Sequence, residues 1–189
     1  MTKHKKRKYN HQIKYKLKKM KKNNSKVIAS ENISVFDIAD FFIRIASQKM
    51  IDDNLSEGIT HLKLQKILYF AQAVYLSIYN KALFNEEIQS WQYGPVIKEV
   101  YSKYSRKGNS TITTSNFEYK IDDKKIAEFL KSVWELFGKY SAYELINITH
   151  NHAPWKESYV KGCKDIIIEK KVLRDYYKGL FDFKSKFNG

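Results

Sequence analysis

Apolar residues recur every three or four positions along much of the chain, which is the spacing of one buried face of an α-helix. The clearest such stretch opens at Thr60 and continues to about Tyr79. Its apolar stripe consists of Leu64, Ile67, Leu68, Ala71, Val74, Tyr75 and Ile78. Gln65, Lys66 and Gln72 fall at the edge of this stripe. The pattern therefore predicts a helix with one buried face and polar residues along its border.

The same spacing predicts further helices on both sides of this one. They run from Ser34 to about Ile51, from Pro95 to about Tyr104, from Lys124 to Phe137 behind an Asp122 cap, from Ser141 to Ile148, and from about Glu169 to Phe181. Ser34 with Asp37, and Ser141 with Glu144, have the spacing of capping boxes. Pro95 suits the first position of a helix, where an amide hydrogen is not needed.

The period changes in two places. Residues 88–93 form a short stretch that would put Trp91 and Tyr93 on one side if it is extended, and Gly94-Pro95 ends it. Residues Thr111–Ile121 are rich in β-branched and aromatic side chains, which favours a strand. We therefore expect a mainly α fold, a compact bundle of about six helices with a small β element near Ile88–Tyr93 and Thr111–Ile121.

The net charge of +15 is concentrated at the N-terminus. Of the 35 Lys and Arg residues, twelve lie in Met1–Lys26, which leaves 23 basic side chains against 20 acidic ones elsewhere. The cationic residues of this tail include Lys5, Lys6, Arg7, Lys8, Lys18, Lys19, Lys21 and Lys22. We expect residues 1–33 to be a disordered basic tail and residues 34–185 to be one domain. Helical spacing of Tyr9, Ile13, Leu17 and Met20 leaves a second possibility, an amphipathic helix that folds on an acidic surface.

The chain has neither the apolar run of roughly 18 residues that a bilayer span needs nor the apolar core of a secretory signal. Its one cysteine, Cys163, cannot form an internal disulfide, which suits a reducing compartment. These features favour a cytoplasmic protein.

No pattern in the sequence points to catalysis. There is no glycine-rich phosphate loop and no nucleophile elbow. His150 and His152, with Cys163 or Glu157, lack the spacing of known zinc sites, and histidines near a helix end more often cap or pack. We therefore expect no metal, no cofactor and no enzymatic activity.

Three segments of the chain together resemble a known family. They are Thr60–Gln72; Trp91–Val96 followed by Val100-Tyr101; and Thr149-His150 with Ala153-Pro154-Trp155. In this order and separation they resemble the SocA-like Panacea domain, also described as the phage-associated GepA type. The resemblance extends over about residues 35–183, and the basic tail is not part of it.

The resemblance implies an antitoxin, often carried on prophages and other mobile elements, that neutralises a co-encoded protein toxin by direct binding. It also leaves open an adaptor that delivers the toxin to the ClpXP protease. A third possibility is a nucleic-acid-binding regulator that uses the lysine-rich tail to neutralise phosphates. No clear helix-turn-helix accompanies that tail, so such contacts would be poorly sequence-specific.

The large aromatic residues of the three segments have two interpretations. Such side chains usually pack in a core, but Trp and Tyr are also common anchors at protein interfaces. The candidate partner-binding residues are Trp91, Tyr93, Lys98, Tyr101, His150 and Trp155. Lys98 is included because it follows the Gly94-Pro95 turn and should point away from the apolar side of its helix.

Overall fold

The computed structural model describes residues 33–53, 58–114 and 121–182. Its helices are α2 (Val35–Asp53), α3 (His61–Tyr79), α4 (Lys98–Tyr104), α5 (Lys124–Phe137), α6 (Ala142–His150), α7 (Ala153–Ser158) and α8 (Lys170–Asp182), with a short 3-10 turn η1 (Ser105–Lys107). The strands β1 (Gln89–Trp91) and β2 (Gly94–Val96) form one antiparallel hairpin. The predicted mainly α fold with a small β element is confirmed. The residues predicted to form the basic tail, Lys5 to Lys22 among them, lie outside the described residues.

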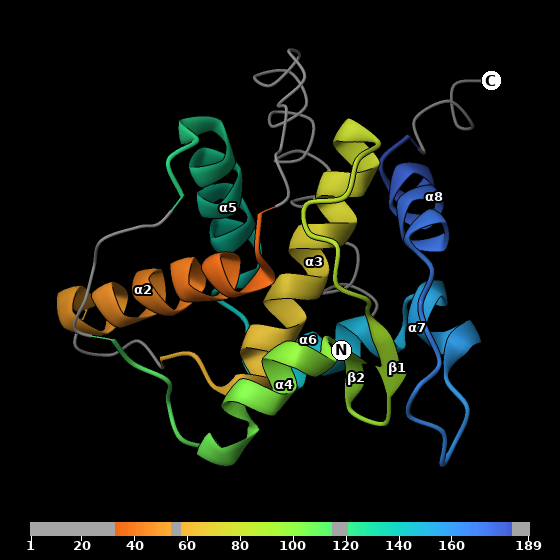
Figure 1. Cartoon of the computed structure of the whole chain (residues 1–189), viewed down its shortest axis with the longest axis horizontal. Helices are drawn as coiled ribbons and strands as arrows, with labels where there is room; N and C mark the ends of the chain where they lie inside the picture. The colour runs from red at the N-terminus through yellow and green to blue at the C-terminus, as the bar shows by residue number, and fades with distance from the viewer. Residues whose placement is uncertain (1–32, 54–57, 115–120, 183–189) are drawn as a thin grey trace, which may run out of the picture.

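Helix α3 is the centre of the molecule. It packs against α2, α4, α5, α6, α8 and strand β2, so other elements surround it (Figure 1). Every residue from Lys63 to Ser77 is buried. Thr60 caps its first turn by accepting a hydrogen bond from the Lys63 amide at 3.3 Å, and Asn80 ends it in the left-handed conformation with φ of 57°.

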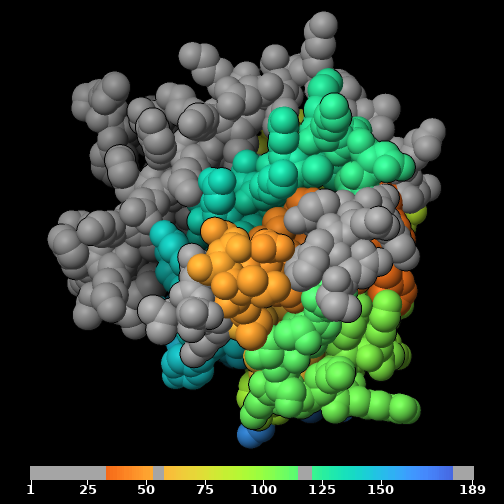
Figure 2. Space-filling view, turned by 90° about the vertical axis from the view of Figure 1, so that its left-hand side faces the viewer, coloured from red at the N-terminus to blue at the C-terminus, as the bar shows by residue number. Residues whose placement is uncertain are grey.

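Apolar faces of the neighbouring helices complete the core around α3. The Phe70 ring stacks on Phe137 of α5 at 4.1 Å between centroids, and its edge meets Tyr177 of α8 at 6.4 Å. Figure 2 looks at the face formed by the C-terminal end of α2, where α2 lies between α4 and α5. Burial of these apolar and aromatic faces is the main driving force for the bundle.

Of two predicted helix caps, one is confirmed and the other lies one residue further along the chain. Ser141 and Glu144 form the predicted capping box, with the Glu144 amide 3.2 Å from Ser141 Oγ and the Ser141 amide 3.0 Å from Glu144 Oε2. Helix α5 is capped by Asp123, not by the predicted Asp122, because the Asp123 carboxylate accepts from the Lys125 amide at 2.8 Å.

The prediction of a helix beginning at Pro95 was wrong. Pro95 lies in β2, paired with Ser90, and α4 begins three residues later at Lys98. Lys66 and Gln65 of α3 donate to the Pro95 and Ile97 carbonyls, which keeps this segment extended, so the first turn of α4 begins only after it. The short helix α7 was not predicted, because its six residues are too few for a visible period.

The second predicted strand is not found among the described residues. Within Thr111–Ile121, residues 115–120 lie outside them, and Ile112 forms a single β-bridge with Ile59. No helix of the described part is long and apolar enough to cross a bilayer.

Candidate partner-binding site

Polar side chains of α3 bind the backbone of the hairpin segment. Gln65 accepts from the Ile97 amide at 2.8 Å and donates to the Ile97 carbonyl at 3.2 Å, so one amide side chain satisfies both groups. Lys66 Nζ donates to the Pro95 carbonyl at 2.8 Å. These bonds fix residues 95–97 in extended form against the helix. Buried backbone groups need such partners, which explains why polar side chains are retained inside the core.

Gln72, one turn and a half further along α3, does the same for the segment before the hairpin. Its Oε1 accepts from the Leu83 amide at 2.7 Å, and its Nε2 donates to the Phe84 carbonyl at 2.7 Å. The prediction that Gln65, Lys66 and Gln72 border the apolar stripe was wrong, since all three are buried. Other elements surround α3, so the helix has no exposed face, and the spacing of its apolar residues could not reveal this.

Lys66 is the most unusual of these residues electrostatically. Burial lowers its pKa from 10.5 to about 7. Burial also lowers the pKa of His61 and of His150, and the Lys66 charge lowers both further, although a backbone hydrogen bond with Gln92 partly opposes the shift at His150. Both imidazoles are therefore mainly neutral at pH 7.

Gly94 fits where larger residues do not. Its φ of 91° lies in the left-handed region, and a Cβ atom there would lie 2.7 Å from Lys66 Cε and 2.9 Å from Thr149 Oγ1. Residues from all three family-like segments thus meet at one point, because Lys66 belongs to the first, Gly94 to the second and Thr149 to the third. The glycine permits this close approach.

Trp155 supports the hairpin from behind. Its Nε1 donates to the Trp91 carbonyl at 2.9 Å, and its side chain is only 7% exposed. Its indole is stacked between the His150 ring, 3.8 Å away at 9°, and the Tyr159 ring, 4.7 Å away at 13°. The three stacked rings hold the first strand in place.

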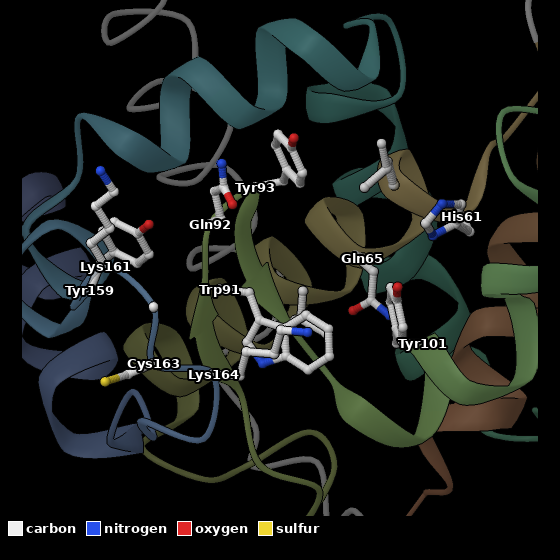
Figure 3. A pocket seen from close by; sticks show the side chains of 13 residues that line it. His61, Gln65, Trp91, Gln92, Tyr93, Tyr101, Tyr159, Lys161, Cys163 and Lys164 are labelled. Atoms are coloured by element: carbon white, nitrogen blue, oxygen red, sulfur yellow. The ribbon is translucent and has the colours of Figure 1, made fainter.

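The hairpin forms one wall of a groove with a volume of about 580 Å³. Trp91 and Tyr93 come from the hairpin and Tyr101 from α4, and the loop after α7 completes the lining with Tyr159, Lys161, Gly162, Cys163 and Lys164 (Figure 3). The Trp91 and Tyr101 rings are 4.9 Å apart. Tyr93 is 61% exposed, an uncommon state for a large aromatic side chain.

The groove is basic on one side. Lys161 and Lys164 line it, and the described residues that line it include no aspartate or glutamate. Lys164 Nζ lies 5.3 Å from the centre of the Trp91 ring, which is a cation–π distance. Lys98 and Asp165 form an exposed ion pair at 3.6 Å near this wall.

The structure brings some of the predicted partner-binding residues together and separates others. Trp91, Tyr93 and Tyr101 line the groove. Lys98 lies on the surface beside it, linked through Asp165 to the loop that carries Lys164. His150 and Trp155 stand behind the hairpin as supports.

The loop that completes the groove could not be found from the sequence pattern. Tyr159, Lys161 and Lys164 lie outside every helix pattern, in a short loop after α7. Gly162 was the one sequence feature that pointed to a turn in this segment, since glycine between helices commonly marks a turn.

The histidine and cysteine candidates do not assemble into a metal site. His152 Nδ1 lies 3.0 Å from the Tyr177 hydroxyl inside the core. Cys163 is exposed at the surface of the groove loop. In the described ranges no three His, Cys, Asp or Glu side chains are placed to hold a metal ion.

Comparison with known proteins indicates the class of protein to which this chain is similar. Residues 64–156 match the family model described as antitoxin SocA-like, Panacea domain. The match covers most of α3, the hairpin, α4, α5 and α6, and it ends before the 159–164 loop. Residues 64–156 are therefore similar to the SocA-like Panacea domain, which confirms the resemblance over this part of the chain.

A curated relative agrees with the family match. The chain is 30% identical over 109 residues to Antitoxin SocA of Caulobacter vibrioides, a match that covers 51% of this chain and 58% of the relative. The chain thus spans less than two thirds of the relative's length. No solved structure gives a significant match.

Proposed function

We propose that this protein is an antitoxin that neutralises a toxin encoded beside it by binding that toxin directly at the groove. The match to the SocA-like Panacea domain and the similarity to Antitoxin SocA support the antitoxin role. On this proposal the protein acts by occupation of the toxin surface and catalyses no reaction.

The proposed position of the binding site rests on one observation, which is that exposed aromatic side chains extend from a backbone held in place by buried residues. Tyr93 is 61% exposed, and Trp91 is partly exposed while its backbone is held by Trp155. Interface hot spots are enriched in Trp and Tyr, and preorganised side chains lose little conformational entropy on binding. A toxin surface that covers this set would gain apolar burial at low entropic cost.

The test is co-expression of this protein with the neighbouring open reading frame under separate promoters. We expect the neighbour alone to arrest growth, and co-expression to restore growth and yield a complex that co-purifies through a tag on either protein. Trp91→Ala should lose rescue while Tyr143→Ala, an exposed aromatic change on α6, should keep it. Rescue that disappears in cells lacking ClpXP would replace direct neutralisation with delivery to the protease. A harmless neighbour would contradict the proposal.

A further inference from the structure

We infer that the groove binds an acidic segment of the toxin, with an apolar side chain entering beside Trp91 and carboxylates pairing with Lys161 and Lys164. This inference rests on the proposed antitoxin function and specifies the chemistry of the partner. It is carried by the shape of the 159–164 loop, the charges along the groove and the aromatic side chains that line it.

The loop is a defined turn. The Cys163 amide donates to the Val160 carbonyl at 3.1 Å, and Gly162 has φ of 86°. A hydrogen bond across four residues with a positive φ at the third is the pattern of a type II turn. Lys161 occupies the second position of this turn and Lys164 follows it. The turn therefore fixes the backbone of Lys161 and determines where the chain continues to Lys164.

The charges in the groove are of one sign. Lys161 and Lys164 are the ionised side chains among the described residues that line it, and His61 is mainly neutral at pH 7 because its pKa is lowered. The nearby Asp165 is engaged by Lys98 at 3.6 Å, and both side chains are exposed. Carboxylates of an entering segment can pair with either amine, and no aspartate or glutamate is among the described residues that line the groove, which gives charge complementarity to an acidic segment.

The other wall is apolar and aromatic. Trp91, Tyr93 and Tyr101 line the groove together with the two lysines, and Lys164 lies against Trp91 while Lys161 lies beside Tyr159 (Figure 3). Lys164 already lies over the Trp91 ring at 5.3 Å, so a carboxylate bound to this amine would lie next to the indole. The volume of about 580 Å³ is within the range of ligand-binding pockets. The best occupant therefore combines acidic residues with an apolar or aromatic anchor.

The position of the lysine wall suggests how partner choice is set. The family match ends at residue 156, and the lysines follow at 161 and 164. The hairpin wall thus belongs to the matched domain, while the basic wall lies beyond it. On our inference the first provides the anchor site and the second selects an acidic partner.

The experiment measures the dissociation constant of the full-length protein for the purified neighbouring gene product, over a range of salt. We compare wild type, Lys161→Glu/Lys164→Glu, and Lys124→Glu/Lys131→Glu, a control on the exposed side of α5 with the same change of charge. Thermal melts establish that all three are folded. We expect at least tenfold weaker binding and a smaller salt dependence for the groove variant, and a change below twofold for the control.

Overlapping synthetic peptides from the neighbour then identify the segment. The captured peptides should be acidic, and their capture should be lost in the groove variant. Groove-variant binding within twofold of wild type, or capture of neutral or basic peptides, would overturn the inference but leave the proposed function standing. Wild-type protein that does not bind the neighbour at all would overturn both. Binding of a short single-stranded RNA that depends on both lysines, with toxin binding unaffected, would assign the groove to nucleic acid and also overturn it.

Discussion

Lys66 Nζ donates a hydrogen bond to the Pro95 carbonyl over 2.8 Å, which joins the buried middle of α3 to the second strand of the hairpin. The amine is fully buried at this point, and its pKa falls to about 7 as a result. The support of the groove wall therefore includes a group whose charge changes near neutral pH.

Stability should depend on pH through this lysine. Between about pH 7 and 10.5 the unfolded chain binds a proton at Lys66 that the folded chain has lost. The free energy of unfolding should therefore rise with pH over this range, with a slope of up to about 1.4 kcal/mol per pH unit. Lys66→Met should remove the rise between pH 7 and 9, measured by urea denaturation. The control Lys131→Met, at an exposed site on α5, should keep it.

The same pH dependence in wild type and Lys66→Met would contradict this account of the amine. It would mean that another group, or an amine ionised in both states, sets the behaviour in that range.

Gly94 should not tolerate a side chain, because its φ is positive and because a Cβ atom there would be too close to Lys66 and Thr149. Gly108 also has a positive φ, of 53°, but a Cβ atom there would have open space. With ψ of −129° its backbone lies outside the left-handed helical region, in a conformation nearly restricted to glycine, so Gly108→Ala should cost about 1–3 kcal/mol of unfolding free energy for the backbone alone. Gly94→Ala should cost clearly more, because its methyl group would displace Lys66 and Thr149. Equal losses in denaturant titrations would show that the close packing at Gly94 contributes nothing.

Leu68 tests the core. It is fully buried in α3, so Leu68→Ala should lower the free energy of unfolding by about 2–5 kcal/mol. Tyr143→Ala, at a side chain that is 72% exposed, should change it by less than about 0.5 kcal/mol. Calorimetric melts of the two variants give the comparison, and a loss below about 1 kcal/mol for Leu68→Ala would argue against the central position of α3.

Lys98 tests the edge of the groove. Its side chain is 61% exposed, so Lys98→Glu should leave the melting temperature nearly unchanged. Reversal of a charge beside the basic wall should slow association with the toxin several-fold, as measured by surface plasmon resonance. Lys131→Glu is the matched control. An association rate equal to that of wild type would place the interface away from α4.

Much of the bundle could be predicted from the sequence because most of its helices bury one face and expose the other. Lys124–Phe137 was predicted with the observed bounds, since its apolar residues keep a helical period throughout. The role of Lys66 could not be predicted in this way. Its burial depends on elements that are remote in sequence, such as β2 and α6, and only the fold places them around α3.

The aromatic residues of the groove could be predicted from the sequence, but its lysines could not. Trp91, Tyr93 and Tyr101 belong to the family-like segments, and their residue types already suggested an interface. In the sequence Lys161 and Lys164 are ordinary surface lysines, and only the folded loop around Gly162 brings them to the groove that Trp91 lines. Their relation to the aromatic wall exists only in three dimensions.

The most direct test of the central claim is isothermal titration of the purified neighbouring toxin into the purified full-length protein, with no protease present. Direct neutralisation predicts a saturable, stoichiometric complex whose formation removes toxin activity in the same mixture, and whose affinity falls in Trp91→Ala while that variant stays folded. Absence of a complex, with growth rescue still present in cells, would contradict direct binding.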